Sequence, residues 1–357
     1  MTVIMKNLLT ISFLCVWGLF LTAPLSAFCQ AAPDPTTESK KALFDLFKPN
    51  DRTDLTITAN FDSIKANIRN KEYESGIFEV KHSRKNSTKL QVKLRSRGKS
   101  RRMMCDFPPL KLKFNKNNLD SIGLETFNEF KLVTHCLDNE RSEVNIMREY
   151  LCYQLFNVLT PYSFKANLVR VTYKNQGDSF KKSTHPGIVI EDSECLAHRN
   201  HCSTMVNQII QIDSMHSYQE KIASVFNYMI GNADWSYLMS RNTELIRLEN
   251  GPVIPVPYDF DYSGIVAAPY ARANAALGQR TVLDRVFLGN ATSYEELKDI
   301  FSYFKSKKGE LLNTIDDFYE LDIVYRSEMK DYLKEFFKLI EDRGRVENEM
   351  LAKVKKG

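Results

Sequence analysis

Alternating apolar and polar residues dominate the first half of the chain. The segments "LTITANF", "GIFEVKHS" and "TKLQVKLRSRG" carry an apolar side chain at about every second position, which is typical of strands with one buried face. In the third segment Leu90, Val92 and Leu94 share one face, and the basic residues of 89–97 share the other. Further strands are predicted in "LKLKF", "EFKLV", "ANLVRVTYK" and "GIVIED", and one amphipathic helix, "SEVNIMREYLCYQLFNVL", interrupts them.

Helical spacing takes over near residue 205. The segment "SYQEKIASVFNYMIGN" begins at a polar residue and ends at Gly231, "NTELIRLENGPVIPVPYDFD" reads as a β-hairpin, and further helices follow residue 268. We therefore predict an α+β protein in two lobes. The first lobe, 55–192, is a mostly antiparallel sheet with one inserted helix, and the second, 193–357, is helical. A flexible polar leader, 32–54, precedes both.

The first 31 residues resemble a secretory signal peptide. Lys6 precedes the apolar run "LLTISFLCVWGLFLTAPL", and small residues follow it. An uncleaved anchor helix is the alternative, and Phe28 before Cys29 argues against a lipid anchor. No later segment is apolar enough to span a bilayer. We expect an exported protein of the bacterial periplasm or cell surface.

Export permits disulfides, and five cysteines follow the signal segment. An odd number leaves at least one thiol free, and Cys152 in the amphipathic helix is the natural buried one. We predict two pairs, Cys105 with Cys136 and Cys195 with Cys202.

The basic residues suggest a ligand without defining it. The net charge of +5 and the few aromatic residues among the basic ones do not indicate nucleic-acid binding. Ten lysines and arginines and no acid lie in 81–104, on a strand that presents its basic face either to solvent or to phosphate. We predict that this face turns toward the cleft between the lobes.

Asp259 and Asp261 directly follow the apolar run "VIPVPY". Alternation points both carboxylates the same way, where they repel unless a positive charge lies between them. A divalent metal ion supplies such a charge, and a solvated turn is the alternative. Asp234 follows the helix that ends at Gly231, and Asn242 precedes the hairpin, so these residues can meet at one point. One carboxylate to accept a hydroxyl proton, with an amide and a carboxylate to hold Mg²⁺, is the arrangement that phosphoryl transfer needs.

Several of these segments resemble one family. "GNADW", "RN" and "PYDFD" are similar to the catalytic loop and metal-binding segment of atypical kinases, above all the CotH-type (spore coat protein H-like) kinases. "LRSRGKS", "FPPLKLKF", "FKLVTHCLDNERSEVNIMREYL" and "GIVIEDSE" extend the resemblance over roughly 88–265. A group of exported bacterial proteins with "DFPPL", "LVTHC" and "VPYDFD" looks closer still. The resemblance implies a two-lobed protein-kinase-like fold that binds ATP and Mg²⁺.

The resemblance also implies roles by matched position. Asp234 would be the general base, Asn242 and Asp259 would bind Mg²⁺, and Asp261 would be a second metal ligand or a structural carboxylate. Either Lys111 or Lys113 would contact the ATP phosphates and pair with Glu149. The remaining implied nucleotide contacts are Arg97 at the phosphates and Glu191 with Asp192 near the adenine.

Two functions are consistent with this sequence. The first is an exported kinase-like enzyme that transfers the ATP γ-phosphate to a hydroxyl of an exported protein or another substrate. The second is a catalytically silent protein in cell-surface binding or assembly, favoured by the absence of a glycine-rich phosphate loop and of a His-Arg pair before Asp234. A hydrolase is not indicated, because no GxSxG motif is present.

Overall fold

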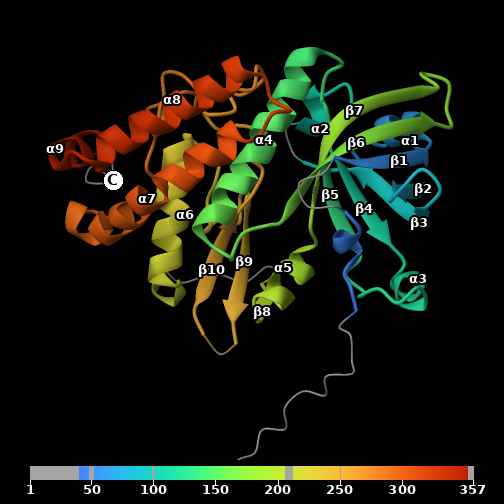
Figure 1. Cartoon of the computed structure of the whole chain (residues 1–357), viewed down its shortest axis with the longest axis horizontal. Coiled ribbons are helices and arrows are strands. Elements are labelled where there is room, and N and C mark those ends of the chain that lie inside the picture. The colour runs from blue at the N-terminus through green and yellow to red at the C-terminus, as the bar shows by residue number, and fades with distance from the viewer. Residues whose placement is uncertain (1–39, 48–51, 99–100, 206–211, 250, 353–357) are drawn as a thin grey trace, which may run out of the picture. The chain divides into compact units, whose positions relative to one another are not determined.

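A closed barrel of seven strands forms the first half of the described chain (Figure 1). The computed structural model describes residues 40–47, 52–98, 101–205, 212–249 and 251–352, so the predicted signal peptide lies outside the described residues. The strands run in the order β1-β2-β3-β4-β5-β7-β6. Their bounds are β1 (Thr53–Ala59), β2 (Glu74–Lys81), β3 (Ser87–Ser96), β4 (Leu110–Phe114), β5 (Glu129–Val133), β6 (Ala166–Asn175) and β7 (Lys182–Ile190).

The closure of this barrel corrects the predicted fold. Strand β6 pairs in parallel with β1, with Leu55 opposite Val171, and so removes both edges of the sheet. The α+β class holds, and the sheet is mostly antiparallel, as predicted, but the two-lobed protein-kinase-like fold is wrong. The sequence predicted all seven barrel strands, although β7 begins at Lys182, five residues before the predicted segment. It could not predict which strands lie at an edge, because β1 and β6 are joined by pairing across more than a hundred residues.

The basic strand β3 faces mainly outward. Leu90, Val92 and Leu94 are buried in the barrel, as the alternation predicted. Lys89 and Lys93 are exposed on the outer face, and Lys89 lies opposite Glu79 of β2. The prediction that the whole basic face turns toward a cleft is therefore wrong, because the outside of a closed barrel is mostly open to solvent.

Part of the predicted leader belongs to the barrel core. Residues Leu43–Leu46 form a short 3₁₀ helix, η1, and Leu43, Phe44 and Phe47 are buried against barrel residues. The ring of Phe44 meets Phe130 edge-on at 6.1 Å, so this segment covers one end of the barrel interior.

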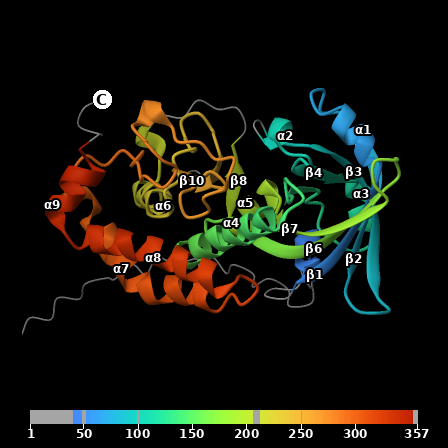
Figure 2. The same ribbon diagram turned by 90° about the horizontal axis from the view of Figure 1, so that it is seen from above.

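Four helices belong to the barrel half: α1 (Phe61–Ala66), α2 (Arg101–Met104), α3 (Lys116–Ser121) and α4 (Glu140–Leu159). Asn139 caps α4 by accepting a hydrogen bond from the Ser142 backbone. Helix α4 packs on β6 and β7 with one side and on α6 and α7 with another (Figure 2). It therefore joins the barrel to the second half of the chain.

The second half combines a small sheet with helices. Strands β10, β9 and β8 form an antiparallel sheet that includes the predicted hairpin. Helices α7 and α8 pack side by side, and α6 packs on β10. The bounds are α5 (Ser193–Arg199), β8 (Cys202–Thr204), η2 (Ile212–Ser214), α6 (Ser217–Ile230), β9 (Thr243–Leu248), β10 (Val253–Pro257), η3 (Ala275–Leu277), α7 (Tyr294–Asp316), α8 (Ile323–Ile340), α9 (Arg343–Arg345) and the π-helical turn η4 (Val346–Met350).

Residues 40–357 form one compact unit by their contacts. Within the described part of it, every helix is too short or too polar to cross a membrane.

Candidate active site

The loop after α6 is held by its own side chains. Gly231 ends the helix in the left-handed conformation, with φ of 68°. The Asn232 side chain accepts from the Asp234 backbone at 3.0 Å. The Asn242 amide nitrogen donates to the Asp234 carboxylate at 3.0 Å and to the Asp234 backbone carbonyl at 2.6 Å. These bonds fix Asp234 beside Asn242, as predicted.

Asp259 joins this pair from the end of β10. The Tyr258 backbone donates to the Asn242 carbonyl at 2.9 Å, and the Asp259 backbone donates to the Tyr153 hydroxyl at 3.0 Å. Asn242 and Asp259 both have positive φ, 48° and 64°, which asparagine and aspartate tolerate better than most residues. Burial raises the pKa of Asp234, Arg241 opposes this, and the negative charge of Asp259 raises it further. The structure thus brings Asp234, Asn242 and Asp259 together.

An arginine supplies the positive charge that the two neighbouring aspartates require. Arg101 of α2 is buried, and its Nη1 lies 3.8 Å from the Asp259 Oδ1. Its Nε lies 3.6 Å from the Asp261 Oδ2, and its Nη1 lies 3.4 Å from the Glu149 Oε2. We call Glu149, Asp259 and Asp261 the carboxylate cluster. The expected repulsion is therefore relieved, at least in part, by a guanidinium from the barrel half.

The carboxylate cluster retains unsatisfied oxygens. The Glu149 Oε1, the Asp259 Oδ1 and the Asp261 Oδ2 are buried and have no hydrogen-bond partner. Burial raises the pKa values of Glu149 and Asp261 although Arg101 opposes it, and the charge of Asp259 raises both further. Arg101, together with Arg97 beside Asp259, does not satisfy all the oxygens of three carboxylates. The cluster can therefore still bind a proton or another cation.

A cleft of about 610 Å³, lined by both basic and acidic residues, adjoins the cluster. Arg97, at the end of β3, lines the cleft and reaches the Asp259 Oδ2 with its Nη2 at 3.8 Å. Lys131 of β5 lies deeper, with its Nζ over the rings of Phe164 and Tyr258 at 4.7 and 5.1 Å. Burial lowers the pKa of Lys131, although Glu244 opposes this. The other charged residues of its lining are the cations Lys111, Lys113 and Lys116 and the acids Glu129, Glu191, Asp192, Glu194 and Glu244, so acids and cations are equal in number.

The predicted pairing of Glu149 with a lysine of β4 is not formed. Strands β4 and β5 are neighbours, and the side chains of Lys111, Lys113 and Glu129 lie on the same face of the barrel wall. Both lysines therefore pair with Glu129, at 2.5 and 3.4 Å. Glu149 pairs with Arg101 instead. Both lysines line the cleft, but neither lies against the carboxylate cluster.

Glu191 and Asp192 serve the local structure. Glu191 is buried, pairs with Arg199 at 2.7 Å and accepts a hydrogen bond from the Lys165 backbone at 2.6 Å. Asp192 caps α5 and accepts from the Glu129 backbone at 2.8 Å. Asp192 also borders the cleft, so it holds strand β5 and helix α5 together at the cleft wall.

One of the two predicted disulfides is formed. Cys105 and Cys136 form a disulfide with their Cα atoms 4.5 Å apart, as predicted. Cys195 and Cys202 carry free thiols, so that predicted pair is wrong. The Cys202 thiol instead donates to the Asn200 carbonyl, where the turn after α5 directs it. Cys152 is buried and free, as expected.

Sequence reasoning missed Arg101 and Lys131. Lys131 stands between the inward-facing Phe130 and Leu132, so alternation did place it on the outer face of the barrel. Nothing in the sequence indicated that this part of the outer face is covered by Ser193 and Glu244. Arg101 lies in a basic run with no periodic pattern, and no local signal separates it from Arg102.

Among the residues that the structure describes, no group of three or more histidine, cysteine, aspartate or glutamate side chains is placed to hold a metal ion. Mg²⁺ needs only one or two protein carboxylates where phosphates and waters complete its shell. Asp259 and Asp261 meet that requirement with one oxygen each that accepts no hydrogen bond and is paired only with Arg101, and Asn242 directs its amide nitrogen to Asp234. These two aspartates are therefore the pair that fits the ion, in competition with Arg101.

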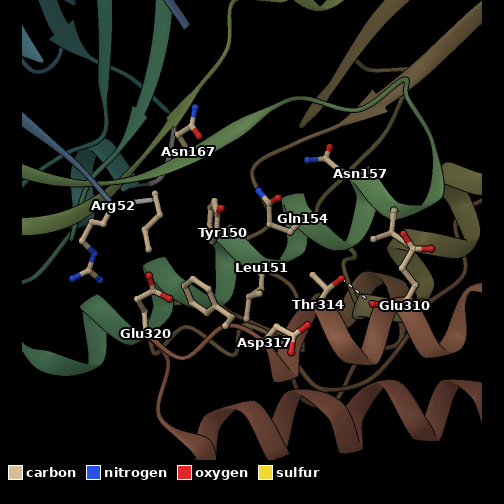
Figure 3. Close-up of a pocket in the computed structure, with 13 residues that line it drawn as sticks. Arg52, Tyr150, Leu151, Gln154, Asn157, Asn167, Glu310, Thr314, Asp317 and Glu320 are labelled. Atoms are coloured by element: carbon tan, nitrogen blue, oxygen red, sulfur yellow. Dashed lines mark hydrogen bonds between the residues drawn. The ribbon is translucent and has the colours of Figure 1, made fainter. Parts of the chain in front are cut away.

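A second cavity, of about 600 Å³, lies between α4, β6 and α7 (Figure 3). Its charged residues are three acids, Glu310, Asp317 and Glu320, and one cation, Arg52. It contains none of the predicted site residues, and its acidic lining does not suit a phosphate ligand.

The chain matches no protein-family model, and no curated protein matches it significantly. The resemblance to CotH-type kinases therefore stays a prediction.

Proposed function

We propose that this protein is an exported phosphotransferase. ATP or a similar nucleotide binds in the cleft with its phosphates toward Arg97 and Lys131, and Asp234 accepts the proton of the acceptor hydroxyl. The acceptor is an exported protein or another hydroxyl compound.

One observation carries the proposal. Asp234, Asn242 and Asp259 come from two separate loops and meet beside a cleft lined by Arg97 and lysines. Phosphoryl transfer needs positioned positive charge for the phosphates and one oxygen base for the hydroxyl. Arg97 and Lys131 supply the former and Asp234 the latter.

Asp234 is suited to the role of base. Its side chain is 39% exposed, so an acceptor hydroxyl can reach it, and its pKa is raised chiefly by burial. A raised pKa brings a carboxylate closer to the operating pH and makes it a better proton acceptor. Leu238 and Met239 are exposed in the same loop, which favours an acceptor with an apolar group next to its hydroxyl.

Mg²⁺ would be held by Asp259 and Asp261 and would neutralise charge on the phosphates when bound. The remaining roles in the site belong to residues of the chain. Arg97 bridges the cleft and Asp259, and Asn242 orients Asp234.

The Cys105–Cys136 disulfide supports the export proposal, because disulfides persist in oxidising compartments. Export itself is tested by the location of the protein in fractionated cells.

The function is tested by measuring ATP-analogue binding and phosphate transfer to candidate exported proteins with three variants. Asp234→Asn should bind the analogue within about threefold of wild type and lose transfer by at least about 100-fold. Asp259→Asn should lose magnesium-dependent binding. Asp299→Asn, an exposed aspartate of α7, is the matched control and should change neither.

Two results would contradict the proposal. A folded Asp259→Asn protein that binds magnesium and nucleotide as wild type does would remove the site from the reaction. A wild-type protein that binds nucleotide but transfers no phosphate to any acceptor or to water would favour the catalytically silent alternative.

A further inference from the structure

The second cavity lies between one face of α4 and one face of α7 (Figure 3). Tyr150, Gln154 and Asn157 recur at helical spacing along α4 and line the cavity from that side. Glu310 and Asp317 line it from α7 and the residue that follows α7. These two acids are seven residues apart, which places them about 10 Å from each other along the helix axis. The cavity therefore carries negative charge at two separated points.

The charge of this lining is locally negative, although the whole chain has a net charge of +5. Its three acids outnumber its one cation, Arg52. Glu310 pairs with Lys307 at 2.7 Å, but the structure gives neither Asp317 nor Glu320 an ion pair with a described residue. No group of acids among the described residues is placed to hold a metal ion, and these acids are spread along the cavity. The lining therefore suits an extended organic cation rather than a metal ion.

Tyr150 is a buried polar side chain that lines the cavity. It is 8% exposed, and its hydroxyl has no hydrogen-bond partner among the described residues. Burial raises the pKa of Tyr150 to about 12, and the negative charge of Glu320 contributes. The Asn157 Oδ1 in the same lining is also buried and without a partner. Because buried polar atoms are normally paired, these two oxygens indicate a ligand that donates hydrogen bonds.

The lining also has an apolar part. The rings of Tyr150 and Phe318 lie 5.5 Å apart, tilted by 42°. Leu151, Val158 and Leu168 complete this part of the cavity. An aromatic face attracts an ammonium group, and the aliphatic side chains can receive a hydrocarbon stem.

We propose that the second cavity binds ammonium groups carried on an unbranched aliphatic chain, as in a free polyamine or in the lysine side chains of a peptide. An ammonium group has three donors and no acceptor, so it matches a lining of carboxylates and unpaired oxygens. Two such groups on one chain can meet Glu310 and Asp317 together, which a single ammonium group cannot. The proposal is independent of the phosphotransferase proposal, because the cavity contains none of the residues assigned to that reaction.

Binding is measured by isothermal titration calorimetry at low ionic strength and without nucleotide. The two probes are spermidine and a short peptide that contains two lysines and has both ends blocked. At least one probe should bind saturably, with one molecule per chain, and the tighter one identifies the source of the ammonium groups. An aliphatic diol of the same length as spermidine lacks the charge and should not bind.

Asp317→Asn should weaken binding at least about fivefold, because it removes a charge that faces the ligand. Asp317 follows the C-terminus of α7, where a negative charge is unfavourable, so its neutralisation should not unfold the helix. Asp299→Asn is the matched control. It is the same substitution at an exposed residue of the same helix that does not line the cavity, and it should match wild type. If Asp317→Asn does not fold, Glu320→Gln in the loop after α7 replaces it.

Tyr150→Phe tests the buried hydroxyl. It keeps the ring and removes one hydrogen-bond acceptor, so binding should weaken about threefold or more.

The absence of saturable binding by both probes would overturn the proposal. Equal affinity in the Asp317→Asn and Asp299→Asn proteins would do the same, since the probe would then bind elsewhere. Binding of the diol as tight as that of spermidine would show that charge plays no part. The assay contains no nucleotide, so none of these results bears on phosphoryl transfer.

Discussion

His135 is a buried histidine in an aromatic stack. Its ring lies 4.9 Å from that of Phe107 and 3.7 Å from that of His185, and its Nδ1 has no hydrogen-bond partner. Burial, with the neighbouring His185, lowers the pKa of His135 to about 3. The folded protein therefore holds this imidazole neutral at pH values where an exposed histidine is charged.

We expect His135 to destabilise the fold in acid. Because its folded pKa lies below the usual value of about 6.5, its neutral form favours folding above that pH. This stability is lost as the pH falls from about 6.5 toward about 3, by up to about 1.4 kcal/mol per pH unit. Urea unfolding at several pH values should show that the free energy of unfolding falls less steeply with decreasing pH in His135→Phe than in wild type. His198→Phe, at an exposed site, should follow wild type, and equal slopes in all three proteins would contradict the assignment.

At the scale of single residues, the sequence predicts what a side chain requires better than it predicts which residue meets that requirement. The spacing of Asp259 and Asp261 correctly implied that two carboxylates share one side and need a positive charge. The charge comes from Arg101, which is far away in the sequence and reaches them only through tertiary packing. Lys111 and Lys113 were visible on one strand face, but their partner Glu129 depends on the pairing of β4 with β5.

At the scale of elements, Gly231 connects α6 to the loop that carries Asp234. A Cβ at this position would lie 2.0 Å from the Tyr332 hydroxyl and 3.3 Å from the Gly264 nitrogen. The Tyr332 hydroxyl is itself engaged, donating to the Leu283 carbonyl at 2.9 Å. Both the left-handed backbone and the close approach of α8 therefore require glycine here.

Gly231→Ala should destabilise the protein by at least about 1–2 kcal/mol from backbone strain alone, with a further cost for displacing Tyr332. Gly309→Ala is the matched control. Gly309 lies in α7, exposed, with nothing within 4 Å of an added Cβ, so alanine should stabilise by about 0.5–1 kcal/mol. Urea unfolding of both variants measures the difference. A Gly231→Ala protein as stable as wild type would contradict the requirement for glycine at this position.

The disulfide between Cys105 and Cys136 is a second feature that acts at the scale of elements. Cys105 and Cys136 are 31 residues apart, so the bond should contribute about 3–4 kcal/mol by restricting the unfolded chain. Replacing both cysteines by alanine should lower the free energy of unfolding by about that amount. Reductant should destabilise wild type similarly and leave the double variant unchanged, since its described cysteines are free thiols. An effect of reductant on the double variant would point to another disulfide.

The helices and strands were predicted well because the sequence patterns that indicate them are local. The helix with Glu149 begins at a polar cap, and the hairpin before Asp259 has an apolar strand. Barrel closure has no such signal. It depends on β1 meeting β6, and the sequence of β1 suits a strand with one or two neighbours equally well.

At the scale of the whole molecule, strands β5 to β7 belong to two hydrophobic cores. Leu132 and Val189 point into the barrel, whereas Val133 and Ile188 pack with α4 and the helices beyond it. Because alternate residues of the same strands serve both cores, neither core can lose these strands without exposing the other. We therefore expect the barrel and the helical half to unfold together.

Ile57→Ala tests this coupling. Ile57 is buried in the barrel on β1, so its truncation should cost about 2–5 kcal/mol. The chain has two tryptophans, and after removal of the predicted signal peptide only Trp235 remains, buried in the second half beside the candidate active site. The unfolding midpoint from Trp235 fluorescence should fall by the same amount as the midpoint from circular dichroism. Ile77→Ala, 46% exposed on the neighbouring strand β2, should leave both midpoints nearly unchanged. A fluorescence transition that stays at the wild-type midpoint while the circular dichroism transition shifts or splits would show that the two cores unfold independently, and that the shared strands do not couple the barrel to the site.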